Sequence, residues 1–202
     1  MPNLSNELKQ LEDMFRFWNK TYFDGIIEEP VITLIPDHRG RAYSWCTTYK
    51  AWGSEKLPTT VGFYEINICA DQLNRSIEEI TGTLLHEMVH LYNLQIGVQD
   101  CSRGNTYHNK KFKEEAEKRG LIISFNKKIG WSVTQINDET KKIIKREKFK
   151  AIKLQRKEEI KIQKPKQSMR KYVCPCCGCI IRATKEVHVS CIDCNEDFIL
   201  EI

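Results

Sequence analysis

The sequence lacks two features that would place the protein in a membrane or outside the cell. No run approaches the roughly 18 apolar residues of a membrane-spanning helix, and residues 1–7 contain no basic region followed by an apolar one. We therefore expect a cytoplasmic protein without membrane contact. Without an export signal its nine cysteines should stay reduced, and reduced thiols are free to bind metal.

The composition is otherwise that of a soluble globular protein. Hydrophobic residues make up 41% and charged residues 29% of the 202 residues. This length is enough for one domain of ordinary size with a buried core, followed by a small module.

The clearest chemical motif is His86-Glu87-x-x-His90. Ser76 and Glu79 match the capping-box pattern, and apolar residues follow at helical spacing, which predicts a helix that begins at Ser76. Two histidines four residues apart lie on one helix face, where both imidazoles can reach one divalent ion. Glu87 lies beside the pair, so its carboxylate can take a proton from a metal-bound water and pass it to a leaving amine.

The alternative interpretation is a helix whose histidines bind nothing. The surrounding residues are so apolar that an uncompensated polar face would be costly to bury, which favours the metal site. One class of zinc protease carries a glycine and then a third histidine just after this motif. Asn93 and Ile96 occupy those two positions here, so that class is excluded.

A catalytic zinc usually has three protein ligands and leaves one position for water, so the two histidines need a third donor. We predict His108, which stands at the start of a second short helix, residues 109–119, with Phe112 one turn later as an anchor. A surface histidine at a helix cap is an open alternative. Three glutamates remain as alternative third ligands: Glu114, Glu115 and Glu117.

Helix and strand patterns surround this motif and predict an α+β fold. Residues 4–22 carry apolar side chains at steps of three or four, which predicts an amphipathic helix. Apolar runs predict a three-stranded sheet before the metal helix and a hairpin after residue 120, with residues 95–107 as a loop. The predicted strands are residues 30–36, 41–52, 61–69, 121–125 and 131–136.

Positive charge is concentrated in one segment. Residues 141–171 contain 14 Lys or Arg and three acidic residues, a net charge of +11, so the rest of the +5 chain sums to −6. We predict a charged helix that fades into a linker near residues 164–168. A merely solvated helix and a helix that contacts nucleic-acid phosphates both fit this pattern. The predicted nucleic-acid contacts are Lys145, Arg146, Lys148 and Lys150.

The C-terminal residues contain two Cys-x-x-Cys knuckles separated by 13 residues. Two such knuckles present four thiolates to one tetrahedral zinc, which predicts a zinc ribbon with a closed, structural site that should unfold on chelation. The predicted ligands are Cys174, Cys177, Cys191 and Cys194.

Several alternatives concern the other residues of this module. Cys176 and Cys179 form a competing pair, but Gly178, directly after Cys177, favours the first register because it lets backbone amides turn towards sulfur. Redox or disulfide use of these cysteines is the weaker interpretation in a reducing compartment. His188 lies outside the knuckles and is expected on a strand surface.

The order of these features resembles the SprT-like zinc metalloprotease family. The resemblance covers about residues 5–136, with the metal motif, a loop and His108-x-x-x-Phe112, and a C-terminal cysteine module is also common in that family. It implies a minimal zincin-like domain over residues 1–136, and the charge and cysteine patterns described above add a basic helix and linker over 137–171 and a zinc ribbon over 172–202. It also implies cleavage of proteins on or crosslinked to DNA, with the basic segment and the ribbon contacting DNA.

We therefore expect a zinc endopeptidase with one catalytic and one structural zinc. Its substrate would lie extended along the sheet edge at Arg41 to Tyr49. Main-chain hydrogen bonds would bind it there, so binding would depend little on the side chains of the substrate. The rival function is a non-enzymatic nucleic-acid-binding protein with a zinc ribbon and a zincin-like scaffold. Glu87 argues against this rival, because a scaffold has no use for that carboxylate.

Overall fold

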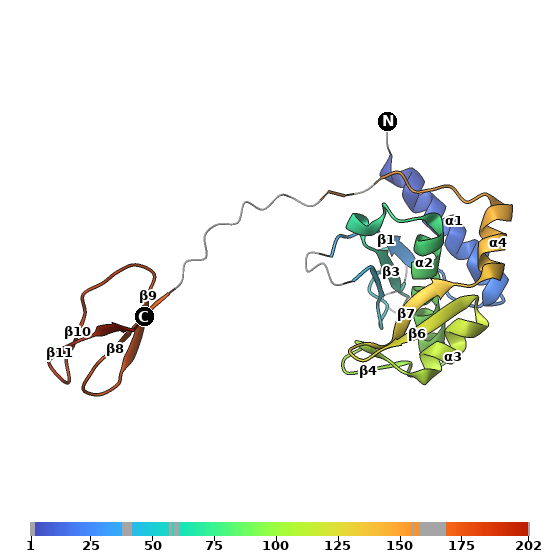
Figure 1. Ribbon diagram of the computed structural model, residues 1–202. Coiled ribbons are helices and arrows are strands. Elements are labelled where there is room, and N and C mark those ends of the chain that lie inside the picture. Colours follow the sequence, from blue (N-terminus) through green and yellow to red (C-terminus); the bar gives the residue numbers. More distant parts are fainter. Residues whose placement is uncertain are drawn as a thin grey trace. The chain divides into compact units, whose positions relative to one another are not determined.

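The computed structural model describes residues 3–37, 42–56, 58, 61–154, 156–157 and 169–201 (Figure 1). The chain divides into two compact units, Met1–Glu158 and Glu159–Ile202. Within the described ranges, no helix has the length and apolar character needed to cross a membrane. All nine cysteines are free thiols.

The first unit combines helices with two small sheets, which confirms the predicted α+β fold. Its helices are α1 (Leu4–Tyr22), the short 3-10 helix η1 (Ala70–Gln72), α2 (Ile77–Gln95), α3 (Lys110–Lys118) and α4 (Asp138–Glu147). The strands of the first sheet, in spatial order, are β1 (Val31–Thr33), β3 (Glu65–Ile68) and β2 (Ser44–Cys46). The strands of the second sheet, in spatial order, are β4 (Cys101–Ser102), β5 (Tyr107–His108), β7 (Gly130–Ile136) and β6 (Leu121–Asn126).

Helix α2 lies at the centre of this unit (Figure 1). It begins with the predicted capping box: Ser76 Oγ accepts a hydrogen bond from the Glu79 N–H at 3.2 Å, and the Glu79 carboxylate accepts one from the Ser76 N–H at 2.9 Å. Most of its length is buried, and its apolar side chains pack with those of α1 and of both sheets in one core. The central position of α2 explains why its sequence is so apolar.

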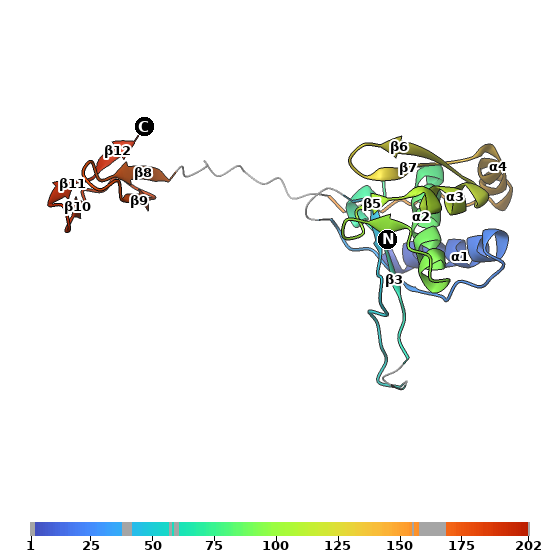
Figure 2. The same cartoon turned by 90° about the horizontal axis from the view of Figure 1, so that it is seen from below.

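Strand β2 is shorter than the predicted strand at residues 41–52. Its pairing with β3 covers only Ser44 to Cys46, and beyond it the chain forms an arm that extends from the body (Figure 2). Trp52 and Phe63 pair across this arm through two backbone hydrogen bonds, and the Trp52 indole donates to Glu65 at 2.9 Å. The predicted loop at residues 95–107 was also too simple, because it contains β4 and the first residue of β5.

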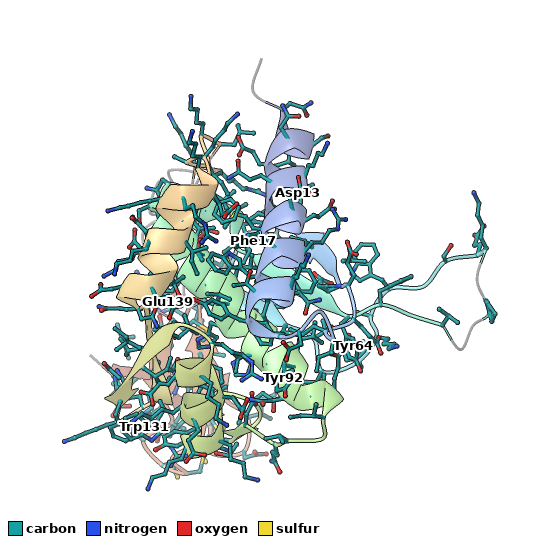
Figure 3. The ribbon with its side chains drawn as sticks, turned by 90° about the vertical axis from the view of Figure 1, so that its right-hand side faces the viewer. Asp13, Phe17, Tyr64, Tyr92, Trp131 and Glu139 are labelled. Atoms are coloured by element: carbon teal, nitrogen blue, oxygen red, sulfur yellow. The ribbon has the colours of Figure 1, made fainter. Side chains whose placement is uncertain are left out.

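The basic helix, α4, belongs to the first unit and packs beside α1. Tyr22 and Thr140 join α1 to α4 by a hydrogen bond between their hydroxyls at 2.7 Å, and the two helices lie side by side (Figure 3). After α4 ends, the Phe149 ring packs against Phe17 at a centroid distance of 5.4 Å, and Ile152 is buried. The compact unit therefore extends to Glu158, beyond the domain end that we expected at residue 136. The predicted linker at residues 164–168 lies outside the described residues.

The second unit consists of short antiparallel strands. Three of them form a sheet in the order β12, β8, β9, and the other two form a separate hairpin. The strands of this unit are β8 (Arg170–Val173), β9 (Ile180–Ala183), β10 (Ser190–Cys191), β11 (Glu196–Asp197) and β12 (Ile199–Glu201). Of its apolar side chains only Tyr172 and two cysteines are buried among the described residues. So small an apolar core fits a module that depends on bound metal.

Replacing Ile152 by alanine should destabilise the first unit by about 2–4 kcal/mol, because it removes a buried aliphatic side chain from the core. Urea unfolding followed by tryptophan fluorescence measures this change. The neighbouring Lys153→Ala, at an exposed position, is the matched control and should change stability by less than about 0.5 kcal/mol. Equal stability of the two variants would show that this segment is not part of the folded unit.

Candidate metal centre

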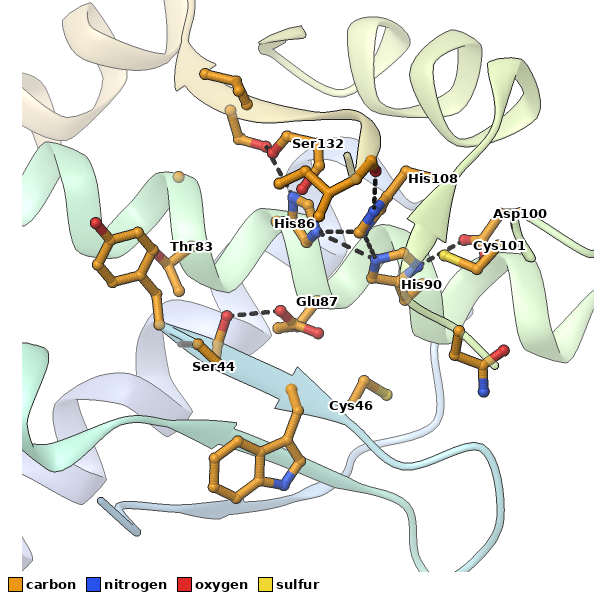
Figure 4. A pocket seen from close by; sticks show the side chains of 18 of the residues that line it. Ser44, Cys46, Thr83, His86, Glu87, His90, Asp100, Cys101, His108 and Ser132 are labelled. Carbon is orange, nitrogen blue, oxygen red and sulfur yellow. Dashed lines mark hydrogen bonds and ion pairs between the residues drawn. The ribbon is translucent and has the colours of Figure 1, made fainter. Parts of the chain in front are cut away.

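The structure brings the three predicted histidines together (Figure 4). His86 and His90 lie one turn apart on α2, and His108 lies at the end of β5. Their Nε2 atoms are separated by 3.1 Å (His86 to His108), 3.1 Å (His86 to His90) and 3.0 Å (His90 to His108). Three nitrogens bound to one tetrahedral zinc at about 2.0–2.1 Å lie about 3.3 Å apart, so the donor set fits this ion.

A separate acceptor fixes the tautomer of each histidine. The Asp100 carboxylate accepts from His90 Nδ1 at 2.8 Å, and the Ile129 carbonyl accepts from His108 Nδ1 at 3.2 Å. His86 Nδ1 lies 2.7 Å from Thr134 Oγ1, whose own proton is donated to the Ser132 carbonyl, so Thr134 accepts here as well. With a proton on each Nδ1, the three Nε2 lone pairs point at one another. This arrangement favours binding of a cation between them.

Local packing sets the position of His108. Its backbone N–H donates to the Ile129 carbonyl at 3.0 Å, and the next residue, Asn109, caps α3 by accepting from two backbone N–H groups. A side chain at Gly130 would collide with the His108 carbonyl, so only glycine allows β7 to come this close. The Phe112 ring lies beneath all three imidazoles, with centroid distances of 4.5, 4.5 and 4.8 Å.

Glu87 is buried, with 5% of its surface exposed. Ser44 Oγ, on β2, donates a hydrogen bond of 2.6 Å to Glu87 Oε1. No hydrogen-bond partner of the other carboxylate oxygen, Oε2, occurs among the described residues, and Glu87 lines the cleft. The side chain is therefore held by one oxygen, while the second can accept a proton.

Burial governs the protonation of these groups. It raises the pKa of Glu87, opposed in part by the charge of His90 and the hydrogen bond from Ser44. Burial, and to a smaller extent the charge of the neighbouring His90, lower the pKa of His108 to about 4. Burial also lowers the pKa of His90, but the hydrogen bonds to Asp100 and Cys101 and the nearby carboxylates raise it more, to about 10. His90 therefore tends to hold a second proton in addition to the one on Nδ1, and a bound metal ion would displace that proton.

The cluster opens into a cleft with a volume of about 1390 Å³. Its floor is the exposed face of α2, and its two walls are formed by residues 42–48, which include β2, and residues 132–136 of β7. Cys46 and Cys101 also line it (Figure 4). The histidine cluster is therefore accessible through this cleft.

The structure does not bring the alternative glutamates to the cluster. Glu115 forms ion pairs with Lys118 and Arg119, and Glu117 pairs with Lys113. Among the described residues, the groups with metal-ligand geometry around His90 do not include Glu114. The groups that sequence reasoning missed are Ser44, Asp100 and Thr134, and only Asp100, a carboxylate close after the motif, left a signal in the sequence.

The second unit contains a cluster of four cysteines whose Sγ atoms all lie within 4.8 Å of one another: Cys174, Cys177, Cys191 and Cys194. The Sγ atoms of Cys177 and Cys191 are 3.8 Å apart, close to the separation of about 3.8 Å for thiolates on one tetrahedral zinc. Cys176 and Cys179, the competing pair, are exposed and lie outside the cluster. Gly178 has a positive φ of 71°, and its N–H donates a hydrogen bond to the Cys174 carbonyl at 2.9 Å.

The four predicted nucleic-acid contacts are exposed on the first unit. Lys145 and Arg146 lie in the last turn of α4, and Lys148 ends the helix in the left-handed conformation. Lys150 follows, and its carbonyl accepts a hydrogen bond from Gln10 at 2.6 Å, which ties the backbone to α1. These cations are therefore held near one another on a folded surface.

Replacing Thr134 by valine keeps the shape of the side chain but removes the acceptor for His86 Nδ1. We expect the affinity of the first unit for zinc to fall about 10- to 100-fold, because the His86 ring loses its fixed tautomer and orientation. Competition with a chromogenic chelator measures this affinity.

The control is Thr106→Val, since Thr106 lines the same cleft but donates its hydroxyl to the Arg103 carbonyl. This variant should bind zinc as the unaltered protein does. Zinc binding by Thr134→Val at unchanged affinity would show that the hydroxyl does not orient His86.

The sequence profile of the SprT-like family matches residues 11–128, which is more than half of the chain. The matched region includes the three histidines and Glu87, whereas β7 and the cysteine cluster lie beyond it. No curated protein and no solved structure matches the chain. The profile match and the zincin-like arrangement around α2 agree: this chain belongs to the SprT-like family.

Proposed function

We propose that the protein is a zinc-dependent endopeptidase. The observation that carries this proposal is the convergence of three Nε2 lone pairs beside a carboxylate with one free oxygen, in an open cleft. Three protein ligands leave one coordination position for water, which distinguishes a catalytic zinc site from a closed structural one. We further propose that the four cysteines hold a second, structural zinc.

The residues of the first centre have separate roles in peptide hydrolysis. His86, His90 and His108 would hold the zinc. When bound, this ion would polarise the scissile carbonyl and lower the pKa of water. Glu87 takes the proton from the attacking water at Oε2 and delivers it to the nitrogen of the leaving amine. Its pKa, raised by burial, suits both steps, since the acid must be able to give the proton back.

Strand β2 is suited to bind the substrate main chain. The Cys69 N–H bonds the Tyr43 carbonyl and the Thr47 N–H bonds the Glu65 carbonyl, so alternate residues of this strand face β3. The backbone groups of Ser44 and Cys46 therefore point to the free edge. An extended substrate can pair with them, which gives binding that depends little on substrate side chains. Arg41, the first residue of the predicted edge, lies outside the described residues.

We propose that the protein substrates are bound to or crosslinked to DNA. Residues 141–157 carry nine Lys or Arg and one acidic residue, Glu147, and those described are exposed on α4 and the segment after it. Such a surface attracts phosphates regardless of base sequence. The zinc ribbon would supply a second contact to the nucleic acid.

Glu87→Gln should lower the rate of casein cleavage at least about 100-fold, because the amide cannot accept the proton. Both zinc ions should remain bound, as counted by mass spectrometry under native conditions. The assay includes reactions with and without added DNA. The matched control is Glu139→Gln, the same exchange in the first turn of α4 at an exposed position that does not line the cleft, which should cleave at the unaltered rate. Equal activity of Glu87→Gln and the unaltered protein would favour the non-enzymatic nucleic-acid-binding function.

Changing the four predicted contacts together to glutamine should weaken binding to random duplex DNA. For each phosphate that the protein no longer neutralises, the slope of log affinity against log salt should become shallower by about 0.9. Fluorescence anisotropy over a series of salt concentrations measures both quantities. The changed residues are Lys145, Arg146, Lys148 and Lys150.

A second quadruple variant serves as the control, because it removes the same net charge from other exposed sites of the first unit. It should bind DNA with the unaltered salt slope. If both quadruple variants weaken DNA binding equally, the loss of affinity results from the change in net charge, and the basic segment does not form a specific DNA-binding surface. The control residues are Lys9, Lys20, Lys127 and Lys128.

A further inference from the structure

Strand β7 offers a second free edge to the cleft. The Asn137 N–H bonds the Gly120 carbonyl at 2.8 Å, and Leu121 pairs with Ile136 and Ile123 with Thr134 in register. Because antiparallel pairs alternate along the ladder, the backbone groups of Thr134 and Ile136 point away from β6.

Nothing in the described chain pairs with that side of β7 beyond its first residue. Strand β5 lies on this side, but its pairing with β7 is limited to His108 and Gly130. From Ser132 to Ile136 the strand lines the same cleft as β2. The catalytic cleft therefore has an unpaired strand edge on each wall.

Both edges are tied to adjacent residues of α2. Ser44 of β2 holds Glu87 through a hydrogen bond of 2.6 Å, and Thr134 of β7 holds His86 at 2.7 Å. Each hydroxyl comes from one of the residues whose backbone groups face the cleft. The two edges thus flank the reaction centre at positions set by the same helix, which keeps them in a fixed relation to the zinc ligands and the general base.

We propose that the substrate binds as the middle strand between β2 and β7, with hydrogen bonds to both. This inference rests on the proposed peptidase function and names its substrate class: a single extended polypeptide segment whose backbone is free on both sides. Consecutive residues of a strand direct their N–H and C=O groups to opposite sides. Alternate substrate residues would therefore pair with Ser44 and Cys46, and those between them with Thr134 and Ile136.

This mode of binding selects for chain conformation. A helix has satisfied its backbone groups internally, and a strand in a sheet has at least one side occupied, so neither can enter between the two walls. Unfolded regions, linkers and chain termini can. The enzyme would then cleave many sequences while sparing folded domains.

A scan of N-methylated peptides tests this proposal. One unstructured peptide that the zinc-loaded, full-length protein cleaves is resynthesised with a single backbone N-methyl group at successive positions, sparing the scissile amide itself. Each methyl removes one donor and leaves every side chain unchanged. We expect kcat/KM to fall about 5- to 10-fold at consecutive positions on both sides of the scissile bond, because each N–H has a partner on one wall or the other.

Losses at every second position only would overturn the proposal, since they would show pairing with a single edge. Cleavage of the parent peptide would still support the peptidase function in that case, whereas a failure of the zinc-loaded protein to cleave any unstructured peptide would count against the function itself. A cyclic hairpin with the same cleavage sequence in one strand provides an independent check. We expect at least about tenfold slower cleavage of the hairpin than of the linear peptide, and equal rates would contradict two-sided binding.

Discussion

The structure depends on satisfying a polar face in the middle of a buried helix. Helix α2 carries His86, Glu87 and His90 on the face that forms the cleft floor, where they are buried or half-buried, and each of these side chains has to find a partner that the helix itself does not supply. Ser44, Thr134 and Asp100 provide those partners from three different segments. The positions of the elements around α2 are therefore determined by hydrogen bonds to these polar side chains as well as by apolar packing.

This constraint explains why the centre and the cleft form one unit. An acceptor on each Nδ1 leaves the Nε2 lone pairs converging, and such an arrangement is stable only around a positive charge. The same side chains that orient Glu87 and His86 belong to the strands that wall the cleft. The proposed metal binding and substrate binding of this SprT-like domain would thus rely on one set of contacts.

Local sequence signals predicted the helix and its motif well, because they act over a few residues. The capping box at Ser76, the four-residue spacing of the histidines and the helix start at Asn109 are all local, and each has its expected place. The partners of these residues are not local: Ser44 lies 43 residues before Glu87, and Thr134 lies 48 residues after His86. No spacing rule connects such pairs, so a single sequence could not reveal them. For the same reason the sequence did not predict that Phe149 and Ile152 pack in the core. They lie in a segment rich in lysine, which has no clear apolar periodicity.

Two unpaired strand edges would ordinarily favour association with other chains. Here both edges lie on the inner walls of a cleft, above the face of α2 that carries the histidines. A folded neighbour can present only an edge that belongs to its own sheet, with at least one side already paired. Under the proposed two-sided binding, the geometry that restricts the substrate to a single extended strand would also disfavour pairing between two folded copies of the protein. Binding of unfolded polypeptide and protection of both edges from folded neighbours would then have one origin, the position of β2 and β7 in the cleft walls.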